Sequence, residues 1–112
     1  MKKDTIQYAD FAKLDMRVGE VTNAVLAEGS SKLIELTVDL GADYGTVTIF
    51  TGMQKWYTPE HFQGKKFLFV ANLEPKKMMG KESQGMILSV DENGKPLLFL
   101  LDKNTSIGVP VS

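Results

Sequence analysis

The segment 58-TPEHFQG-64 carries the signals of a short helix in a chain whose other patterns are mostly those of strands. Thr58 suits the N-cap, Pro59 suits the first helical position, and Gly64 suits the end of a helix. Only about two turns fit between these residues. Where this helix falls among the strands determines which all-β architecture the chain can form.

Three segments before the helix predict strands. In 32-KLIELTVDL-40 apolar and polar residues alternate, with Leu33 as the exception, which is typical of a half-buried strand. The segment 45-GTVTIFTG-52 reads as a strand between two glycines. The segment 16-MRVGEVTNAVLAE-28 is rich in β-forming residues, and Gly19 predicts a bend that lets this long strand serve both halves of a barrel.

Strand patterns resume after the helix. The continuous apolar run 66-KFLFVANL-73 predicts a central strand covered on both faces. The segments 86-MILSV-90 and 97-LLFLL-101 flank Asn93-Gly94, the strongest short-range hairpin signal in the chain. Five strands with a helix between the third and the fourth is the layout of an OB-fold barrel.

Length and composition fit this prediction. The chain has 112 residues, of which 43% are hydrophobic and 24% charged, which is ordinary for one globular domain. We therefore predict an all-β, five-stranded OB-fold barrel in a single domain, 1–112, with its core at about 10–90 and a β-rich extension at about 91–112. A second short helix is expected at 8-YADFAKL-14.

Few residues suit catalysis or metal binding. The chain has no cysteine and a single histidine, His61, which favours a surface position in the short helix over a role as general base. Asp91 and Glu92 fall in a predicted turn, where solvation explains them, and no phosphate-binding glycine loop is present. We expect a non-enzymatic protein without metal or cofactor, without a membrane span and without a secretory signal.

Charge is unevenly distributed along the chain. The formal net charge is −1, but Lys55 to Lys81 contains six lysines and two glutamates, a net charge of +4. A phosphate backbone responds to such a local patch rather than to the total charge. Charge alone still favours the simpler interpretation, a solvated surface.

The segment 72-NLEPKKMMGKESQGM-86 matches neither a strand nor a helix pattern, so we expect a loop. Such a loop could be a connector, a partner-docking loop or part of a nucleic-acid site. OB barrels bind oligonucleotides on one face and its loops. Residues suited to face bases there are Phe50, Trp56, Tyr57, Lys32 and Asn23, with packing beside the short helix as the equal alternative for Trp56 and Tyr57.

Three blocks of the sequence resemble the tRNA-binding domain found at the C-terminus of many bacterial methionyl-tRNA synthetases, in stand-alone dimeric proteins and in cytokine-like synthetase cofactors. They are 10-DFAKLDMRVGEV-21, 51-TGMQKWYTPEHFQGKK-66 and 71-ANLEPKKMMGKESQGMIL-88. Their consistent order from about Asp10 to about Val90 makes the resemblance specific. The chain departs from the family at 27-AEGSSKL-33, where many members have His-Pro-x-Ala-Asp before the lysine, and at Thr51 and Met53, which replace serine and isoleucine.

The resemblance implies an OB-fold that binds tRNA by shape in the cytoplasm and assists an aminoacyl-tRNA synthetase, of the methionyl type. Lysines would neutralise phosphates, while small polar and soft apolar groups would contact sugars and bases. Carried onto this chain, the implied tRNA-binding residues are Lys32, Lys76, Lys77, Lys81, Ser83, Gln84 and Met86.

A secretion-related branch of the same fold implies an alternative function, that of a chaperone-like protein-binding module. The methionines of this chain, among them Met53, Met78, Met79 and Met86, would suit adaptable peptide contacts, or they could simply fill the core. The intact block 82-ESQGM-86 resembles the synthetase-type branch more closely.

The apolar extension predicts a homodimer, because it exceeds what one edge strand needs to bury. The resemblance implies the same, because dimeric members of the tRNA-binding domain family close a two-fold interface with such an extension. A dimer would place two basic loops on one RNA. The expected interface residues are Leu97, Leu98, Phe99, Leu100, Leu101, Ile107, Val109 and Val111.

Overall fold

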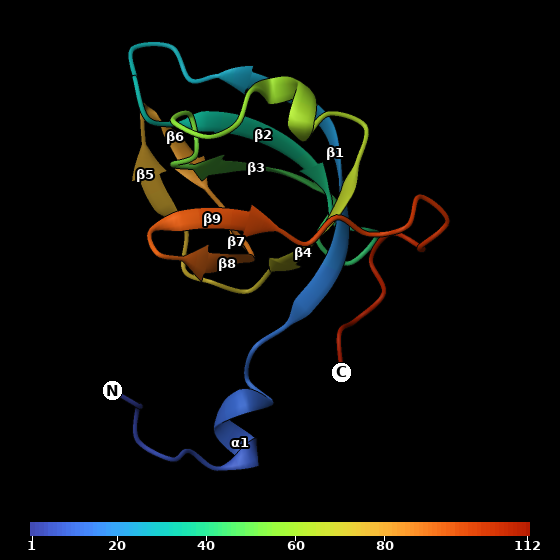
Figure 1. Ribbon diagram of the computed structural model, residues 1–112. Coiled ribbons are helices and arrows are strands. Elements are labelled where there is room, and N and C mark those ends of the chain that lie inside the picture. The colour runs from blue at the N-terminus through green and yellow to red at the C-terminus, as the bar shows by residue number, and fades with distance from the viewer.

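The computed structural model describes residues 1–112, in which five antiparallel strands form a nearly closed barrel (Figure 1). The strands pair in the order β3-β2-β1-β4-β7, which confirms the predicted all-β, OB-like architecture. Two hydrogen bonds to β3 close the barrel: Gln84 N donates to Thr48 O at 2.8 Å, and Phe50 N donates to Ser83 Oγ at 3.1 Å. The five strands are β1 (Met16–Leu26), β2 (Ile34–Asp39), β3 (Thr46–Thr51), β4 (Lys66–Val70) and β7 (Met86–Ile87).

The long strand β1 serves both halves of the barrel, as predicted. Residues 16–20 pair with β4 and residues 20–26 pair with β2. The register irregularity lies between Val21 and Asn23, however, and not at Gly19. Gly19 is required for another reason, since a Cβ there would stand 2.7 Å from Cδ2 of Phe69 inside the barrel.

The predicted short helix between the third and fourth strands is present as one turn of 3-10 helix, η1 (Pro59–His61). Thr58 precedes it in an extended conformation, and its backbone N donates to Nδ1 of His61 at 3.0 Å. The helix is shorter than predicted because Gly64 turns the chain with a φ of 78° and its N donates to Val21 O at 2.7 Å. Phe62, just after the helix, is fully buried and belongs to the hydrophobic core.

The second predicted helix is also present and short. It is α1 (Tyr8–Phe11), which stands apart from the barrel at the N-terminus (Figure 1). Tyr8 is 81% exposed and Phe11 41% exposed, so neither packs into the core. None of the helices is long and apolar enough to cross a membrane.

The core fills the inside of the barrel with inward-facing residues of all five strands. Burial alternates perfectly along β2, as its sequence predicts. The largest fully buried side chains are Phe62, Phe67, Phe69, Ile34, Leu36, Leu40 and Ile49. A close-packed interior of this kind fixes the positions of the strand ends. The loops that join these ends are therefore also fixed in position.

Two hairpins lie outside the five-stranded sheet. Hairpin β8 (Ser89–Glu92)–β9 (Lys95–Leu98) turns at Asn93-Gly94, where φ is 52° and 88°, as predicted. The second hairpin, β5 (Lys76–Met78)–β6 (Lys81–Ser83), corrects the expected loop. Its strands are short and mostly exposed, so they leave no alternating pattern in the sequence. Here Met78 is half-buried and Met79 is exposed.

The C-terminal residues return to β1. Val18 N donates to Val109 O at 3.0 Å, Gly108 N donates to Val18 O at 2.8 Å, and Val111 N donates to Met16 O at 2.9 Å. This segment follows the side of β1 that does not pair with β4. The first half of β1 is thereby paired on both edges.

Candidate nucleic-acid interface

The β5–β6 hairpin carries two lysines with no acidic partner. Lys76 and Lys77 are exposed, and the ion pairs of the structure involve neither of them. Lys77 lies opposite Glu82 in the hairpin register, which moderates the potential around its ammonium group. Lys76 lies opposite the buried Ser83 and keeps its full charge toward solvent.

Lys81 differs from these two lysines because it has a partner. Its Nζ donates to Oε2 of Glu35 on β2 at 2.8 Å. The lysine side chain is 58% exposed and the glutamate only 19% exposed. A phosphate would have to compete with this carboxylate for the ammonium group of Lys81. We therefore expect Lys81 to contribute less to phosphate binding than Lys76.

Lys32 lies in the β1–β2 loop, which is next to the hairpin (Figure 1). A Cβ on Gly29 of this loop would stand 3.3 Å from Cε of Met79, so the tip of the hairpin touches the loop. The side chain of Lys32 is exposed and has no ion-pair partner. The hairpin and the loop thus touch, and we call their four lysines the basic rim: Lys32, Lys76, Lys77 and Lys81.

The predicted residues after the hairpin occupy three different environments. Ser83 is 6% exposed, and its Oγ accepts the hydrogen bond from Phe50 N, so it joins β6 to β3. Gln84 is half-buried and its backbone closes the barrel at Thr48. Met86 is 48% exposed at the start of β7. Of this group, Met86 is the side chain most open to a ligand.

The aromatic candidates divide between the core and the surface. Phe50 is 8% exposed, but it follows the core residue Ile49 along β3 and pairs with Glu35, so its side chain lies on the outer face of the strand. Tyr57 packs edge-on against Phe62, with ring centroids 5.9 Å apart, and its hydroxyl donates to Pro96 O at 2.8 Å. Tyr57 therefore follows the packing alternative. Trp56 is half-buried at the surface, and Asn23 is exposed on β1.

One charged network was not anticipated from the residues. The carboxylate of Asp15 accepts hydrogen bonds from Nε of Arg17 at 2.6 Å and from Oη of Tyr44 at 2.5 Å. Nη1 of Arg17 donates to Asp43 Oδ2 and to Gly108 O, each at 3.0 Å. These contacts attach the C-terminal segment to β1, so the Asp-Met-Arg motif has a structural role here. Its only signal in the sequence was the i, i+2 spacing of Asp15 and Arg17 at the start of β1.

The hydrogen bonds in this network shift the pKa values of its members. Those from Arg17 and then Tyr44 hold the pKa of Asp15 below its ordinary value of 3.8. The hydrogen bond to Asp15 also raises the pKa of Tyr44 above 10.0. Both shifts favour the charged carboxylate and the neutral phenol at neutral pH.

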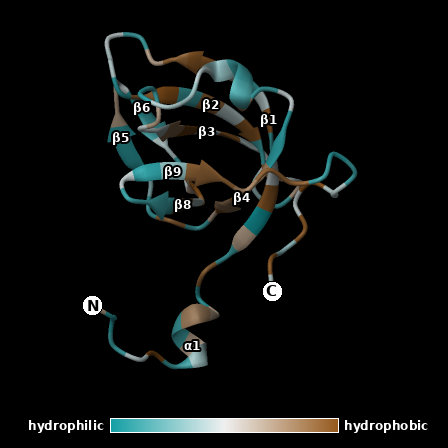
Figure 2. Ribbon diagram, viewed as in Figure 1, coloured by the Kyte–Doolittle hydropathy of each residue, from teal (hydrophilic) through white to brown (hydrophobic).

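The predicted dimer residues form two groups in the structure. Leu97, Phe99, Leu100 and Val109 are 37%, 41%, 61% and 40% exposed. The other four are half-buried: Leu98, Leu101, Ile107 and Val111. Figure 2 shows hydrophobic colour along the second half of β9 and the segment after it. Leu98 packs against the core of the barrel, and the exposed members leave apolar side chains in contact with solvent.

Comparison with known proteins places this arrangement in a family. Residues 16–110 match the model of the family described as "Putative tRNA binding domain", which covers β1, the barrel, both hairpins and the returning segment. The chain belongs to this tRNA-binding domain family. The predicted resemblance to the domain is thereby confirmed.

Relatives of this tRNA-binding domain include methionine–tRNA ligases. The chain is 40% identical over 111 residues to that of Caldanaerobacter subterraneus subsp. tengcongensis, with 99% of this chain and 17% of the ligase covered. It is 45% identical over 105 residues to that of Cupriavidus pinatubonensis, with 91% and 15% covered. The domain thus spans less than a fifth of the length of these curated relatives.

Solved structures agree with the fold. A MetRS-related protein from Pyrococcus horikoshii superposes with a TM-score of 0.91 at 39% identity, with 98% of this tRNA-binding domain and 100% of that chain covered. The chaperone CsaA of Bacillus anthracis superposes with a TM-score of 0.83 at 29% identity, with 97% and 100% covered.

Proposed function

We propose that this domain is a non-enzymatic module that binds tRNA by shape through the basic rim and assists an aminoacyl-tRNA synthetase of the methionyl type. The observation that carries the proposal is the position of Lys76 and Lys77: exposed, without ion-pair partners, and held on a hairpin in contact with the loop of Lys32. Lysines on such a rim neutralise phosphates as point charges. We expect the domain to act in the cytoplasm, where it would meet a tRNA and a synthetase.

The residues of the Ser83–Met86 block contribute in different ways within this proposal. Met86 contacts an exposed base or ribose, and Gln84 offers its side-chain amide at the rim. Ser83 acts by holding β6 on β3, because its oxygen already accepts a hydrogen bond from Phe50 N. Lys81 contributes to the rim once its ion pair with Glu35 opens.

The test is a gel-shift titration of an unmodified tRNA transcript at several salt concentrations. The log of the binding constant should fall linearly with the log of salt concentration, and the Lys76→Ala/Lys77→Ala variant should reduce that slope by about two. Lys2→Ala/Lys3→Ala is the matched control, since it removes the same charge from the exposed N-terminal segment. An unchanged slope for the hairpin variant would contradict the assignment.

The domain also forms a homodimer in this proposal, with about 10–90 as the core of one domain and about 91–112 as the dimerising extension. Exposed apolar side chains at Leu97, Phe99 and Leu100 support it, because a second copy would remove them from water. The proposed interface also includes Leu98, Leu101, Ile107, Val109 and Val111. Two rims on one RNA would turn the second contact into an intramolecular one.

A chaperone-like protein-binding function is the second candidate. It is favoured by the likeness to CsaA and by two exposed methionines, Met79 and Met86, which are 46% and 48% exposed. Light scattering of an aggregating client protein separates the two functions. Suppression of aggregation together with no shift of tRNA would favour the chaperone, whereas a tRNA shift without suppression would favour the main proposal.

A further inference from the structure

A small pocket adjoins the basic rim between the β1–β2 loop and the segment that follows β3. Its volume is about 330 Å³, and it is lined by Ser31, Lys32, Leu33, Gly52, Lys55 and Trp56. This volume is at the small end of the range for ligand pockets, so one compact group fits where a helix would not. The lining contains two lysines and no carboxylate.

Hydrogen bonds from one residue hold the two walls of this pocket together. Nε2 of Gln54 donates to Ser30 O at 3.0 Å and to Leu33 O at 2.6 Å, and Gln54 N donates to Lys32 O at 3.2 Å. Oγ of Ser30 also accepts from the backbone N of Lys32 and of Leu33, each at 3.1 Å. The pocket is therefore formed in advance, and a ligand would not have to order the loop.

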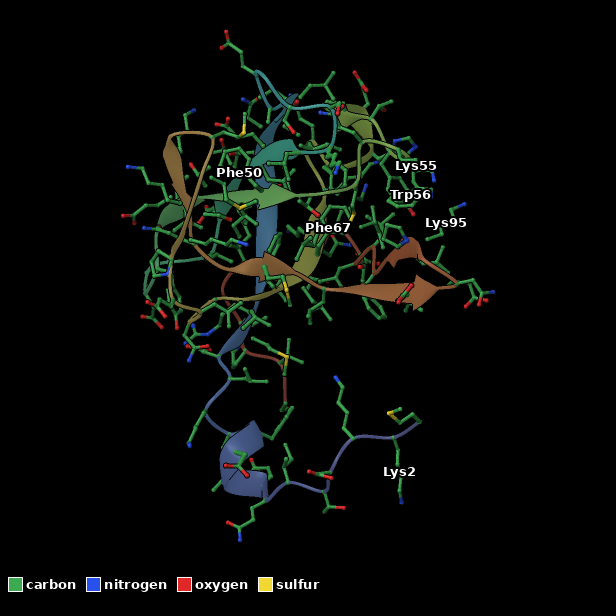
Figure 3. All side chains as sticks on the ribbon, turned by 90° about the vertical axis from the view of Figure 1, so that its left-hand side faces the viewer. Lys2, Phe50, Lys55, Trp56, Phe67 and Lys95 are labelled. Atoms are coloured by element: carbon green, nitrogen blue, oxygen red, sulfur yellow. The ribbon has the colours of Figure 1, made fainter.

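The indole of Trp56 forms an aromatic wall of the pocket. It is half-buried, and Nζ of Lys55 lies 5.5 Å from its ring centroid. Figure 3 shows Lys55, Trp56 and Lys95 at the same edge of the molecule. A partly exposed ring with lysines around it is the arrangement on which proteins stack single-stranded bases.

We propose that this pocket binds one unpaired nucleotide of tRNA, with its base against Trp56 and its phosphate between Lys32 and Lys55. The proposal rests on the proposed tRNA-binding function and deepens it. Neither ammonium group has a carboxylate partner, so both are free to take the phosphate. Lys55 leaves the ring as the base arrives, because a base stack is stronger than an exposed cation–π contact.

A second hollow beyond Trp56 fixes which way the nucleotide lies. It has a volume of about 390 Å³, and its lining includes Trp56, Gly52, Asp91, Ser89 and Pro96. The carboxylate of Asp91 is exposed there and repels a phosphate. The phosphate therefore lies on the side of Lys32, toward the rim lysines Lys76 and Lys77, and the strand continues along the rim.

Trp56 is the only tryptophan of the chain, so tryptophan emission reports on the surroundings of this one indole. The experiment titrates the protein with a hexauridylate RNA and, separately, with an unmodified tRNA transcript, and follows the emission while a gel shift measures binding of the same tRNA. Both RNAs should quench the emission in a saturable way, with the tRNA curve matching the gel-shift curve. A transcript trimmed of its unpaired 3′ nucleotides distinguishes that end from a loop as the source of the nucleotide.

Three variants test the contacts. Trp56→Leu should weaken tRNA binding about tenfold, and Trp56→Phe should retain most of the affinity because it keeps a stacking ring. Lys55→Ala changes an exposed side chain and should lower the salt slope by about one, whereas Lys2→Ala at the far end of the molecule should leave it unchanged. Circular dichroism confirms folding of each variant.

The outcomes separate this proposal from the one on which it rests. If tRNA shifts in the gel while the emission of Trp56 and the affinity of Trp56→Leu stay unchanged, the pocket proposal is overturned and the rim proposal stands. If tRNA does not shift at all, the proposed function fails, and the pocket proposal fails with it. Matching quenching and gel-shift curves with a weaker Trp56→Leu variant support both.

Discussion

The hydroxyl of Tyr44 donates a hydrogen bond of 2.5 Å to Oδ2 of Asp15, the carboxylate that also accepts Nε of Arg17 at 2.6 Å. These residues come from three places in the sequence: the segment before β1, β1 itself and the β2–β3 turn. The carboxylate thus links the turn to the strand, while Arg17 extends the connection to Gly108 O. Stability should depend on this carboxylate and on its charge.

Asp15→Asn should lower the free energy of unfolding at pH 7 by about 1.5–3 kcal/mol, the usual contribution of hydrogen bonds to a charged group. The pKa of Asp15 is lowered in the folded state, so its stabilisation is complete above the ordinary value of 3.8 and is lost as pH falls through the lower folded pKa. Urea unfolding of both proteins from pH 7 to pH 2 should therefore converge at the acid end. Asp4→Asn, on the exposed N-terminal segment, is the control; a constant difference across this range would contradict the prediction.

Gly85→Ala should destabilise the barrel by about 3 kcal/mol or more. Gly85 has a φ of 111°, and an added Cβ would stand 2.7 Å from the carbonyl oxygen of Val70, a backbone atom that cannot rotate away. Gly80→Ala is the matched variant, since Gly80 has a φ of 79° with nothing within 4 Å of an added Cβ. It should cost only about 1–2 kcal/mol. Equal losses in urea unfolding would show that the contact with Val70 has no effect.

Lys81→Ala should reduce the salt slope of tRNA binding less than Lys76→Ala does. The reason is the ion pair of Lys81 with Glu35, which already neutralises part of its charge. Glu35→Gln should free the ammonium group and make the slope steeper by up to about one. Gel shifts at four or more salt concentrations measure all three slopes, and a flatter slope for Glu35→Gln would exclude this account of Lys81.

Leu100→Glu should convert the proposed dimer into monomers. Leu100 is 61% exposed on the apolar extension, and a glutamate at a two-fold interface would be desolvated and placed near its own copy. Val25→Glu is the matched control, because Val25 is 44% exposed on β1 outside the extension. Sedimentation at micromolar concentration measures whether each protein is a monomer or a dimer. A monomeric wild-type protein in the same run would refute the dimer itself.

The sequence predicted those parts of the fold whose side chains face a core. Burial along β2 follows its alternation of apolar and polar residues. The hairpin turns at Asn93-Gly94, because a tight turn needs positive φ values and these two residues adopt them readily. The β5–β6 hairpin escaped prediction because most of its residues are exposed and nothing selects an alternating pattern there. Two long-range contacts hold the hairpin instead. Ser83 accepts a hydrogen bond from Phe50 N, and Met79 lies next to Gly29 of the β1–β2 loop.

The candidate site was predictable in its charges and less so in its contacts. A run of lysines is visible in the sequence, and the structure places Lys76, Lys77 and Lys32 on one rim. Whether a lysine is free or paired depends on long-range neighbours such as Glu35, 46 residues from Lys81. The same holds for Trp56 and Tyr57, which are adjacent in sequence but divide between a surface pocket and the core.

The return of the C-terminal segment to β1 has a consequence for synthesis of the protein. Arg17 and its acceptor Gly108 are separated by 91 residues, so one edge of β1 stays unpaired for roughly 5–20 s of translation. An unpaired strand edge invites wrong partners, and a charged side chain on it discourages them. Arg17 lies on that part of β1, so we expect the residue that later joins the C-terminal segment to β1 also to discourage mispairing of the nascent chain.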